Sequence, residues 1–509
     1  MVTTIDTTET SKYERAATGI SGLDEVLLGG LPRGHLYLLQ GEAGTGKTTI
    51  GMQFLLEGVR SGETVLLVTL AEMTADLQEI AHSHGWSLEG LNIYELTAAE
   101  AAQQLGGEQT IFPTAEVELS GATDEIIDVL RELQPRRVVF DSVTEIRLLA
   151  EDPLRYRRQI LTLRSVLDEI KATVIFADIQ PYDAGSRVLD SLVHGIIRLD
   201  RRVPVYGTTR RRVEVSKLRG SRYKEGWHDF RIETGGVEIY PRAARAEDGE
   251  LGIWDRLSSG LEALDNLVGG GLEMGTACLL AGTSGTGKST VAGLYVYSAL
   301  QQGIPAAILL FDERPETLYK RSHDLGMPLR PYAEAGLLTV RQVETGEISA
   351  GEFGHYMRSL VEEEGVKVLV VDSLTGYLRA MPEENLVVNQ MHDLLNFLSR
   401  RGVLTLLIVT HHGLLGEANE QALDMSYLSD TVILLRHFEA GGALHLAISV
   451  IKKRHGRHEK TIREIVIEPG GVQVGEPIEG FRGVLTGNPE FEGRLQTLVD
   501  ASPGETTDE

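Results

Sequence analysis

One stretch near the N-terminus decides the fold: Gly41-Glu42-Ala43-Gly44-Thr45-Gly46-Lys47-Thr48, which fits the pattern G-x-x-x-x-G-K-[ST]. A strand-like apolar run precedes it and a helical pattern follows it. In this context the glycines let backbone N–H groups wrap a phosphate, and the N-terminus of the following helix favours negative charge. The stretch therefore predicts a nucleotide site in which Lys47 reaches the β- and γ-phosphates and Thr48 binds Mg²⁺.

The pattern recurs in the second half of the chain as Gly282-Thr283-Ser284-Gly285-Thr286-Gly287-Lys288-Ser289. Two other pairs of residues keep the offset between Lys47 and Lys288; they are Leu23 with Leu264 and Glu72 with Glu313. A constant offset indicates duplication of a whole domain. Two matches in the same context also disfavour chance Gly-rich turns.

The two stretches predict two sets of ATP-binding residues, with Lys47 and Lys288 also acting in catalysis. Thr48 and Ser289 are the predicted hydroxyl ligands of Mg²⁺. The first set is Gly44, Thr45, Gly46, Lys47, Thr48 and Thr49, and the second is Ser284, Gly285, Thr286, Gly287, Lys288, Ser289 and Thr290.

Each copy alternates apolar, β-branched runs with longer helical patterns. Near-continuous apolar runs are typical of a parallel sheet buried on both faces, and alternation with helices indicates right-handed βαβ units. The predicted fold class is α/β, with two tandem RecA-like P-loop NTPase domains, each a mostly parallel sheet flanked by helices. The predicted strands of the first copy are His35–Gln40, Thr64–Thr69, Arg137–Phe140 and Thr173–Ala177.

Composition changes along the chain suggest where the domains begin and end. Residues 241–252, rich in Ala, Arg and acids, read as a linker between a first domain at 13–240 and a second at 253–489. The polar ends, residues 1–12 and 490–509, are expected to be flexible.

Carboxylates follow the neighbouring predicted strands in both copies. Asp141 and Asp372 each end an apolar run and are predicted to hold Mg²⁺, although an Asp in this place is often only a turn residue. Glu72, Asp312 and Glu313 follow the second strand and are the candidate catalytic bases, Asp312 being also a candidate metal ligand. Their alternative role is capping the next helix.

The net charge and the cysteine count limit the classes of function and site that the chain can have. The net charge of −25 disfavours nucleic-acid binding, and the runs Arg201–Arg202 and Arg210–Arg212 read as a solvated loop or a subunit contact. The single cysteine, Cys278, excludes disulfides and cysteine-based zinc sites within the chain. With neither a signal peptide nor a membrane-length apolar stretch, no membrane contact is expected and the predicted location is cytoplasmic.

The tandem motifs, together with Asp141–Thr144 and Asp372–Thr375, resemble those of the KaiC family over nearly the whole chain. The resemblance implies a homohexamer of two stacked rings with ATP bound between neighbouring subunits. It also implies that two basic segments reach the neighbour's ATP, whereas in an isolated domain they would be ordinary solvated charges. These segments contribute Lys217, Leu218, Arg219 and Ser221 in the first copy, and Lys452, Lys453, Arg454, His458 and Lys460 in the second.

The resemblance further implies ATP hydrolysis by the first ring and autophosphorylation of adjacent hydroxyl residues in the second. Ser426 keeps the first acceptor position, while Tyr427 replaces the second acceptor. Ala71 replaces one of two adjacent acids in the first copy, which puts the hydrolysis rate there in question. A KaiB-like protein partner is conceivable, but the sequence identifies no residue for it.

Three functions stay open on the sequence. The first is an ATP-hydrolysing ring with serine autokinase activity at Ser426, acting in circadian-type timing or signalling. The second is an ATP-assembled scaffold with little turnover, for which Ala71 is the best support. The third is a RecA- or RadA-like DNA-dependent ATPase, which predicts zinc-binding cysteines or basic DNA loops.

Overall fold

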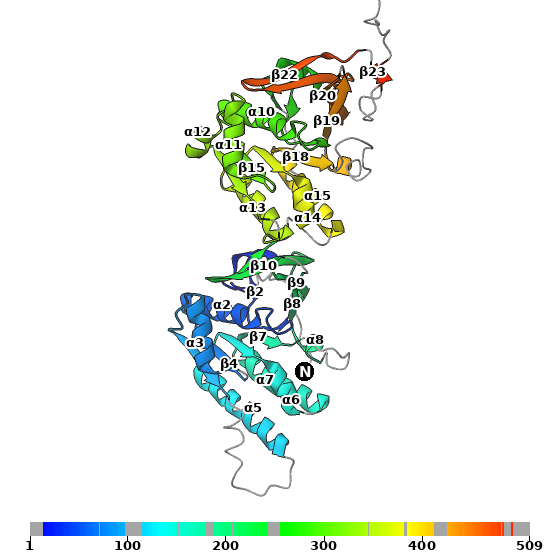
Figure 1. Cartoon of the computed structure of the whole chain (residues 1–509). Helices are drawn as coiled ribbons and strands as arrows, with labels where there is room; N and C mark the ends of the chain where they lie inside the picture. The colour runs from blue at the N-terminus through cyan, green and yellow to red at the C-terminus, as the bar shows by residue number, and fades with distance from the viewer. Residues whose placement is uncertain are drawn as a thin grey trace, which may run out of the picture. The chain divides into compact units, whose positions relative to one another are not determined.

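The computed structural model divides into two compact units, which Figure 1 shows along the chain. One unit comprises residues 1–244 with 349–355, and the other comprises 245–348 with 356–509. The predicted linker, 241–252, lies almost wholly outside the described residues. These are 14–70, 72–96, 114–150, 152–179, 188–204, 207–242, 255–344, 346–380, 384–411, 425–440, 442–479, 481–482 and 490–491.

The first unit is built on a nine-stranded sheet in the order β11-β10-β9-β8-β3-β7-β6-β4-β5. The six strands from β8 to β5 run parallel, and β9 to β11 extend the sheet antiparallel. The strands are β3 Leu36–Gln40, β4 Val65–Thr69, β5 Leu91–Glu95, β6 Arg137–Asp141, β7 Thr173–Asp178, β8 Gly195–Arg202, β9 Arg210–Leu218, β10 Trp227–Glu233 and β11 Gly236–Tyr240, with the short pair β1 Arg15–Ala16 and β2 Leu31–Pro32. The predicted strands are confirmed to within one residue at each end.

Helices cover both faces of this sheet, as expected for a parallel sheet. Along one strand, Leu39 belongs to the apolar core on the α2 face, while Leu38 belongs to the core formed with α5, α6 and α7. The sheet is therefore buried on both faces, which explains the continuous apolar runs. The helices are α1 Ser21–Val26, α2 Lys47–Arg60, α3 Thr74–Ser83, α5 Thr114–Leu133, α6 Val143–Ala150, α7 Pro153–Glu169 and α8 Val188–Leu192.

The second unit repeats the first strand for strand, in the order β16-β15-β17-β18-β14-β19-β20-β21-β22. Its strands are β14 Ala277–Thr283, β15 Ala306–Leu310, β16 Leu338–Gln342, β17 Val368–Asp372, β18 Leu404–His411, β19 Thr431–Ala440, β20 Ala443–Lys453, β21 Arg463–Glu468 and β22 Gly471–Pro477, with the short pairs β12 Arg256–Leu257 and β13 Leu272–Glu273, and β23 Phe481–Arg482 and β24 Glu490–Phe491. Its helices are α9 Glu262–Leu267, α10 Lys288–Gln301, α11 Pro315–Asp324, α12 Arg330–Glu334, α13 Ala350–Glu362, α14 Leu374–Ala380, α15 Glu384–Arg400 and the 3₁₀ helix η2 Met425–Leu428. The predicted domain duplication is thus present in the fold.

In both units the parallel strands give the sheet two chemically different edges. We call the edge at which these strands end the carboxyl edge, and the edge at which they begin the amino edge. The loops after β3 and β14, which hold the two phosphate-binding stretches, leave the carboxyl edge. Among the described helices, none is both long and apolar enough to cross a membrane.

A buried ion pair ties the central strand β6 of the first unit to the loop after α2. The Arg137 side chain is only 1% exposed, and its Nε donates to Glu63 Oε2 at 2.7 Å. Burial alone would raise the pKa of Glu63, but hydrogen bonds from Arg137 and Arg33 outweigh it and lower that pKa to about 2. A carboxyl whose pKa is depressed by folding stabilises the fold above its ordinary pKa, and this contribution is lost as the pH falls toward the folded value.

We expect Glu63→Gln to lower the free energy of unfolding of the first unit by about 3 kcal/mol at pH 7, because it leaves Arg137 buried without its partner charge. The difference from the unchanged chain should shrink as the pH falls from 4.5 toward 2. Urea unfolding at several pH values measures this. Glu57→Gln, which breaks the exposed pair with Arg60, is the control and should cost less than about 1 kcal/mol. Equal losses of unfolding free energy in the two variants would contradict a stabilising role for the buried pair of Arg137 and Glu63.

Candidate functional site

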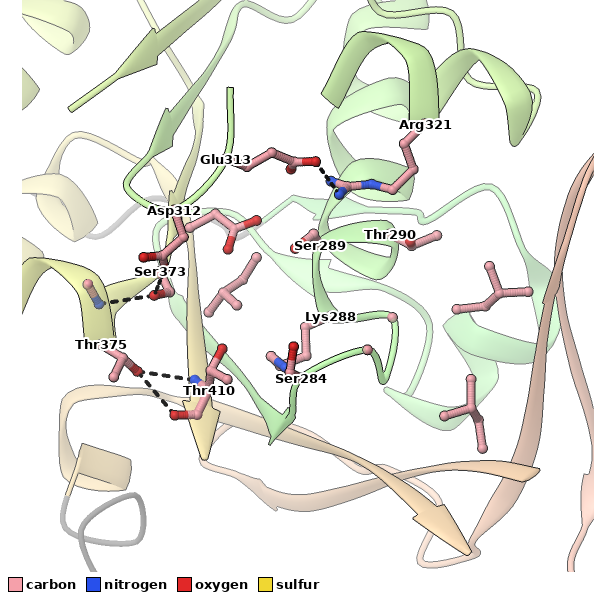
Figure 2. A pocket seen from close by; sticks show the side chains of 17 residues that line it. Ser284, Lys288, Ser289, Thr290, Asp312, Glu313, Arg321, Ser373, Thr375 and Thr410 are labelled. Carbon is pink, nitrogen blue, oxygen red and sulfur yellow. Dashed lines mark hydrogen bonds and ion pairs between the residues drawn. The ribbon is translucent and has the colours of Figure 1, made fainter. Parts of the chain in front are cut away.

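A cavity of about 790 Å³ opens at the carboxyl edge of the second unit (Figure 2). It brings together the predicted phosphate-binding loop, the acids after β15 and β17, and residues of β18. Residues far apart in the sequence therefore share one site. The lining residues are Ser284, Gly285, Gly287, Lys288, Ser289, Thr290, Asp312, Glu313, Arg321, Asp372, Ser373, Thr375, Gly376, Ile408, Thr410, Leu446 and Ile467.

The two lysines of the loops fold back over the loop that carries them. Lys288 Nζ donates to the carbonyl oxygen of Thr283 at 2.6 Å, and Lys47 Nζ donates to those of Gly41 and Glu42 at 2.9 Å. Burial lowers the pKa of both amines, that of Lys288 to about 8. Each ammonium group thus lies over a glycine-containing loop that leads into a helix N-terminus, a place that suits a bound phosphate.

Both loops depend on glycine where they enter the helix. Gly46 and Gly287 are the N-caps of α2 and α10, with φ of 100° and 86°. A Cβ on Gly46 would lie 2.7 Å from Ile232 Cδ1, and one on Gly287 would strike Ile467 Cδ1. The isoleucines come from β10 and β21, so the antiparallel extension of each sheet closes one side of the phosphate loop.

The acids of the first site offer oxygen atoms that suit a cation. Thr48 Oγ1 lies 3.5 Å from Glu72 Oε1, and a hydrogen bond from Thr48 to Asp141 opposes the rise that burial causes in the pKa of Asp141. Burial, together with the charge of Asp141, also raises the pKa of Glu72. Glu72 Oε2 and Asp141 Oδ2 are buried and have no hydrogen-bond partner among the described residues. Hydroxyl and carboxylate oxygens are the ligands that Mg²⁺ prefers, so these residues fit that ion.

The second site arranges its acids differently, as Figure 2 shows. Ser373 Oγ donates to Asp312 Oδ2 at 2.8 Å, while Arg321 holds Glu313 at 2.6 Å. Burial raises the pKa of Asp372, which accepts a hydrogen bond from Ser289. Among the described residues, no group of three or more His, Cys, Asp or Glu surrounds one point. A cation in this unit would therefore share its ligands between the protein, water and phosphate.

The basic segments lie at the other edge of each sheet. Lys217 pairs with Ile196 near the start of β8, and Lys452 pairs with Val432 near the start of β19. Lys217 Nζ donates to the carbonyl oxygens of Asp190 and Val193 at 2.5 and 2.9 Å, and Lys452 Nζ to that of Ser429 at 2.9 Å. They are thus separated from the phosphate loop of their own unit by the full length of the strands.

The neighbours of these lysines divide into surface and interior residues. Arg219 and Arg454 are exposed, and Arg454 forms an ion pair with Asp430 at 3.2 Å. Lys453, by contrast, has a fully enclosed side chain whose amine lies 2.9 Å from Glu273. Lys453 therefore stabilises its own unit from within. The other residues predicted in these segments are the buried Leu218, the half-buried Ser221 and His458, and the exposed Lys460.

The structure adds residues that the sequence did not indicate. The arginine runs 201–202 and 210–212 lie on β8 and β9, so the first predicted alternative, a solvated loop, is wrong, while the second, a subunit contact, stays a prediction. Arg211 Nε donates to the carbonyl oxygen of Gly44 at 3.4 Å, so this run reaches the phosphate loop. Arg321, Thr375 and Thr410 of the second site were also missed. Of these three, Thr375 alone had a signal in the sequence, because it repeats Thr144; the positions that match Arg321 and Thr410 hold Ile80 and Ile179.

Two predicted features are described only in part. Ser426 lies in η2, just before β19 and next to the exposed Tyr427, and is therefore at the amino edge of the second unit. Ala71, whose missing carboxylate raised the question of turnover, lies outside the described residues.

Nine-stranded sheets of this order, with a glycine loop, a lysine and strand-end acids at the carboxyl edge, define P-loop ATPase domains of the RecA-like class. The profile of the KaiC ATPase family matches residues 16–244 and again residues 257–479. The chain therefore belongs to the KaiC family of ATPases, and it carries two of the family's ATPase domains.

Relatives of known name resemble the chain over nearly its full length. The circadian clock protein KaiC3 of Synechocystis sp. is 28% identical, and the match covers 97% of this chain and 99% of the relative. The circadian clock oscillator protein KaiC of Parathermosynechococcus lividus is 27% identical, over 95% of this chain and 90% of the relative. The KaiC of Acaryochloris marina is 28% identical, over 93% and 90%.

We expect Gly46→Ala and Gly287→Ala each to weaken nucleotide binding in their own unit only. The positive φ and the contact with Ile232 or Ile467 should weaken binding by about tenfold or more, since a forced backbone of this kind costs about 1–3 kcal/mol. Titration with a fluorescent ATP analogue, counting sites per chain, measures the effect. The control is Gly62→Ala, which also has a positive φ but lies in open space after α2. Full binding by both loop variants would show that the loops do not hold the phosphates.

Proposed function

We propose that the chain is a magnesium-dependent ATPase that works as a homohexamer of two stacked rings, in which each ATP is held at the carboxyl edge of one copy and completed by the amino edge of the next. One observation carries this proposal. The basic residues Lys217, Arg219, Lys452 and Arg454 lie at the edge opposite the phosphate loop of their own unit. They are too far along the strands to act on that loop, and this supports a role toward an ATP held by another copy.

Within each site, the chain's own residues divide the work of hydrolysis. Lys47 and Lys288 bind the phosphates, and Thr48, Asp141, Ser289 and Asp372 would hold Mg²⁺, which when bound neutralises charge on the transferring phosphate. Glu72 in the first site and Asp312 or Glu313 in the second would accept the proton of the attacking group. A cation supplied from the next copy would stabilise charge that develops on the phosphate.

We further propose that the second unit phosphorylates Ser426 of a neighbouring copy. Ser426 precedes β19, and Arg454 Nη2 donates to the carbonyl oxygen of the adjacent Tyr427 at 3.0 Å. The acceptor segment thus shares the amino edge with the basic segment that would face the neighbour's ATP. Because this segment and the phosphate loop of the same unit lie at opposite edges, we propose transfer from another copy and not from its own unit.

The names of the relatives, which are circadian clock proteins, support a role in circadian-type timing or signalling. The proposal includes a KaiB-like partner, a cytoplasmic location and no binding to DNA. The net charge of −25 opposes binding to DNA. The competing function is a scaffold that ATP assembles without turnover. Steady release of phosphate from magnesium-ATP would exclude the scaffold, and a chain that binds ATP and releases none would support it.

The autokinase is tested by mixing two variants that are each inactive in one role. Chains with Lys288→Ala keep Ser426 but lack a working second site, and chains with Ser426→Ala keep the site but lack the acceptor. With γ-labelled magnesium-ATP, we expect covalent label on the Lys288→Ala chains only in the mixture, because the transfer runs between copies. Mass spectrometry locates the label.

Two results of the mixing experiment would contradict the proposal. Label on Ser426→Ala chains would place the acceptor elsewhere, with Tyr427 the first residue to examine. If the unchanged chain takes up label but the Lys288→Ala chains take up none in the mixture, transfer occurs within one copy. Chains with Tyr427→Phe serve as the matched control and should accept label like the unchanged chain.

A further inference from the structure

A buried polar cluster beside the first phosphate site is not used by the function proposed above. Asp178, the last residue of β7, is 2% exposed. Its Oδ1 accepts a hydrogen bond from Thr144 Oγ1 at 2.8 Å, and its Oδ2 lies 3.2 Å from Arg147 Nη1. Tyr156 of α7 is also 2% exposed, and its hydroxyl has no hydrogen-bond partner among the described residues.

The cluster adjoins the phosphate loop through the backbone as well as through charge. Asp178 pairs with Gln40, the last residue of β3, and its carbonyl oxygen accepts from the N–H of Gly41 at 3.2 Å. The charge of Asp178 also acts on the amine of Lys47. The carboxylate therefore lies behind the wall of the first phosphate site, within electrostatic reach of the lysine that binds phosphate.

The second unit shows that the fold does not need this cluster. Val409 pairs with Ala281 in the second sheet as Asp178 pairs with Gln40 in the first. Matching positions in the helices hold Leu378 where the first unit has Arg147, and Val387 where it has Tyr156. Val387 and Val409 are buried like their counterparts. Burying an ion pair in this place costs desolvation free energy that apolar packing avoids. Because the first unit alone carries the pair, we infer that the pair serves the first phosphate site and not the fold.

The two units share the hydroxyl that the cluster contacts. Thr375 lines the second cavity, and its Oγ1 accepts from the N–H of Thr410 at 3.1 Å. Thr144 is placed in the same way, and its Oγ1 accepts from the N–H of Ile179 at 3.1 Å. The two threonines differ in the group that accepts their hydroxyl proton. Thr144 donates it to a carboxylate at 2.8 Å, whereas Thr375 has only a carbonyl oxygen at 3.4 Å.

A threonine hydroxyl has one proton and two lone pairs. In the first unit Asp178 takes the proton and Ile179 takes one lone pair, so Thr144 can offer the site only its second lone pair, as a hydrogen-bond acceptor. Water can donate to such an atom, while a phosphate oxygen cannot. In the second unit the longer contact leaves the Thr375 proton free to turn toward phosphate.

We propose that Asp178, held by Arg147, is a positioning residue of the first ATP site that fixes the Thr144 hydroxyl as an acceptor for the attacking water. The inference rests on the proposed hydrolysis at that site. One O–H of the water donates to Thr144 and the other to Glu72, which directs the oxygen lone pair at the γ-phosphorus. The water oxygen forms the new P–O bond, and the bond to the bridging oxygen breaks with its electron pair leaving on ADP. The proton taken by Glu72 passes to the product phosphate.

The test uses the full chain carrying Lys288→Ala, so that turnover reports on the first site. Asp178→Asn keeps the shape of the side chain. Because Arg147 needs the amide oxygen as its acceptor, the amide N–H faces Thr144 and donates to it, so the Thr144 proton turns into the site. We expect kcat to fall about ten- to a hundredfold, the loss typical of a misplaced reactant, with unchanged affinity for a fluorescent ATP analogue. Thr144→Val should give the same fall, and the double variant should lose no more than either single variant.

Two further variants separate positioning from structure. Asp168→Asn also removes a carboxylate paired with an arginine, Arg164, but on the exposed side of α7, and it should keep full activity. The triple change Arg147→Leu, Tyr156→Val and Asp178→Val copies the second unit. It should unfold at the same temperature as the parent or higher and bind the ATP analogue, but hydrolyse ATP more slowly than the parent.

The outcomes distinguish this inference from the function on which it rests. Three results would overturn the positioning role while leaving hydrolysis in place. Asp178→Asn could turn over ATP at the normal rate, or its loss of activity could be explained wholly by weaker ATP binding. The effects of the two single variants on kcat could also multiply in the double variant. If the Lys288→Ala parent binds the analogue but releases no phosphate, hydrolysis at the first site fails and the role of Asp178 falls with it.

Discussion

The common direction of the parallel strands is the constraint on which every site in this chain depends. Because β3, β4, β6 and β7 all end at one edge, Lys47, Glu72 and Asp141 meet there although the sequence separates them widely. The same direction sends Lys217 to the far edge. Under the proposed function, one copy's carboxyl edge and the next copy's amino edge would together complete each ATP site, and a ring of copies would follow.

Much of this arrangement could be predicted from the sequence, because its signals are local. The loops that carry Lys47 and Lys288 need glycine at fixed places, and Asp141 and Asp372 directly follow apolar strands. Repetition strengthened each signal, at an offset of 241 residues for the loop lysines (288 − 47) and 231 for the strand-end aspartates (372 − 141). The same locality explains why the four central strands of the first unit were placed within a residue.

The residues that were missed depend on contacts between distant segments. Asp178 ends an apolar strand like Asp141, but its copy in the second unit is Val409, so repetition gave no signal for it. Lys453 lies in a basic run, and only the fold shows that its side chain is enclosed and forms an ion pair with Glu273. Arg201 and Arg211 reach the first phosphate loop because β8 and β9 pair in a particular register, which the sequence does not specify.

The two units carry different residues at several matching positions around the ATP site, and these differences affect the chemistry that each site can perform. The first keeps an ion pair behind its site and a single acid, Glu72, after the second strand, while the second packs apolar residues there and carries Asp312 and Glu313. A buried ion pair adds little net stability, so its presence in one copy alone agrees with the proposed role of Asp178 at the first site.

Complementation between copies tests the central claim most directly. One chain carries Lys47→Ala and Lys288→Ala, and the other carries Arg219→Ala and Arg454→Ala, so that each lacks one half of every site. Phosphate release from magnesium-ATP is measured for each chain and for their mixture. The account predicts little release from either alone and a recovered rate in the mixture, where intact halves meet between copies. A mixture no more active than the sum of its parts would contradict it.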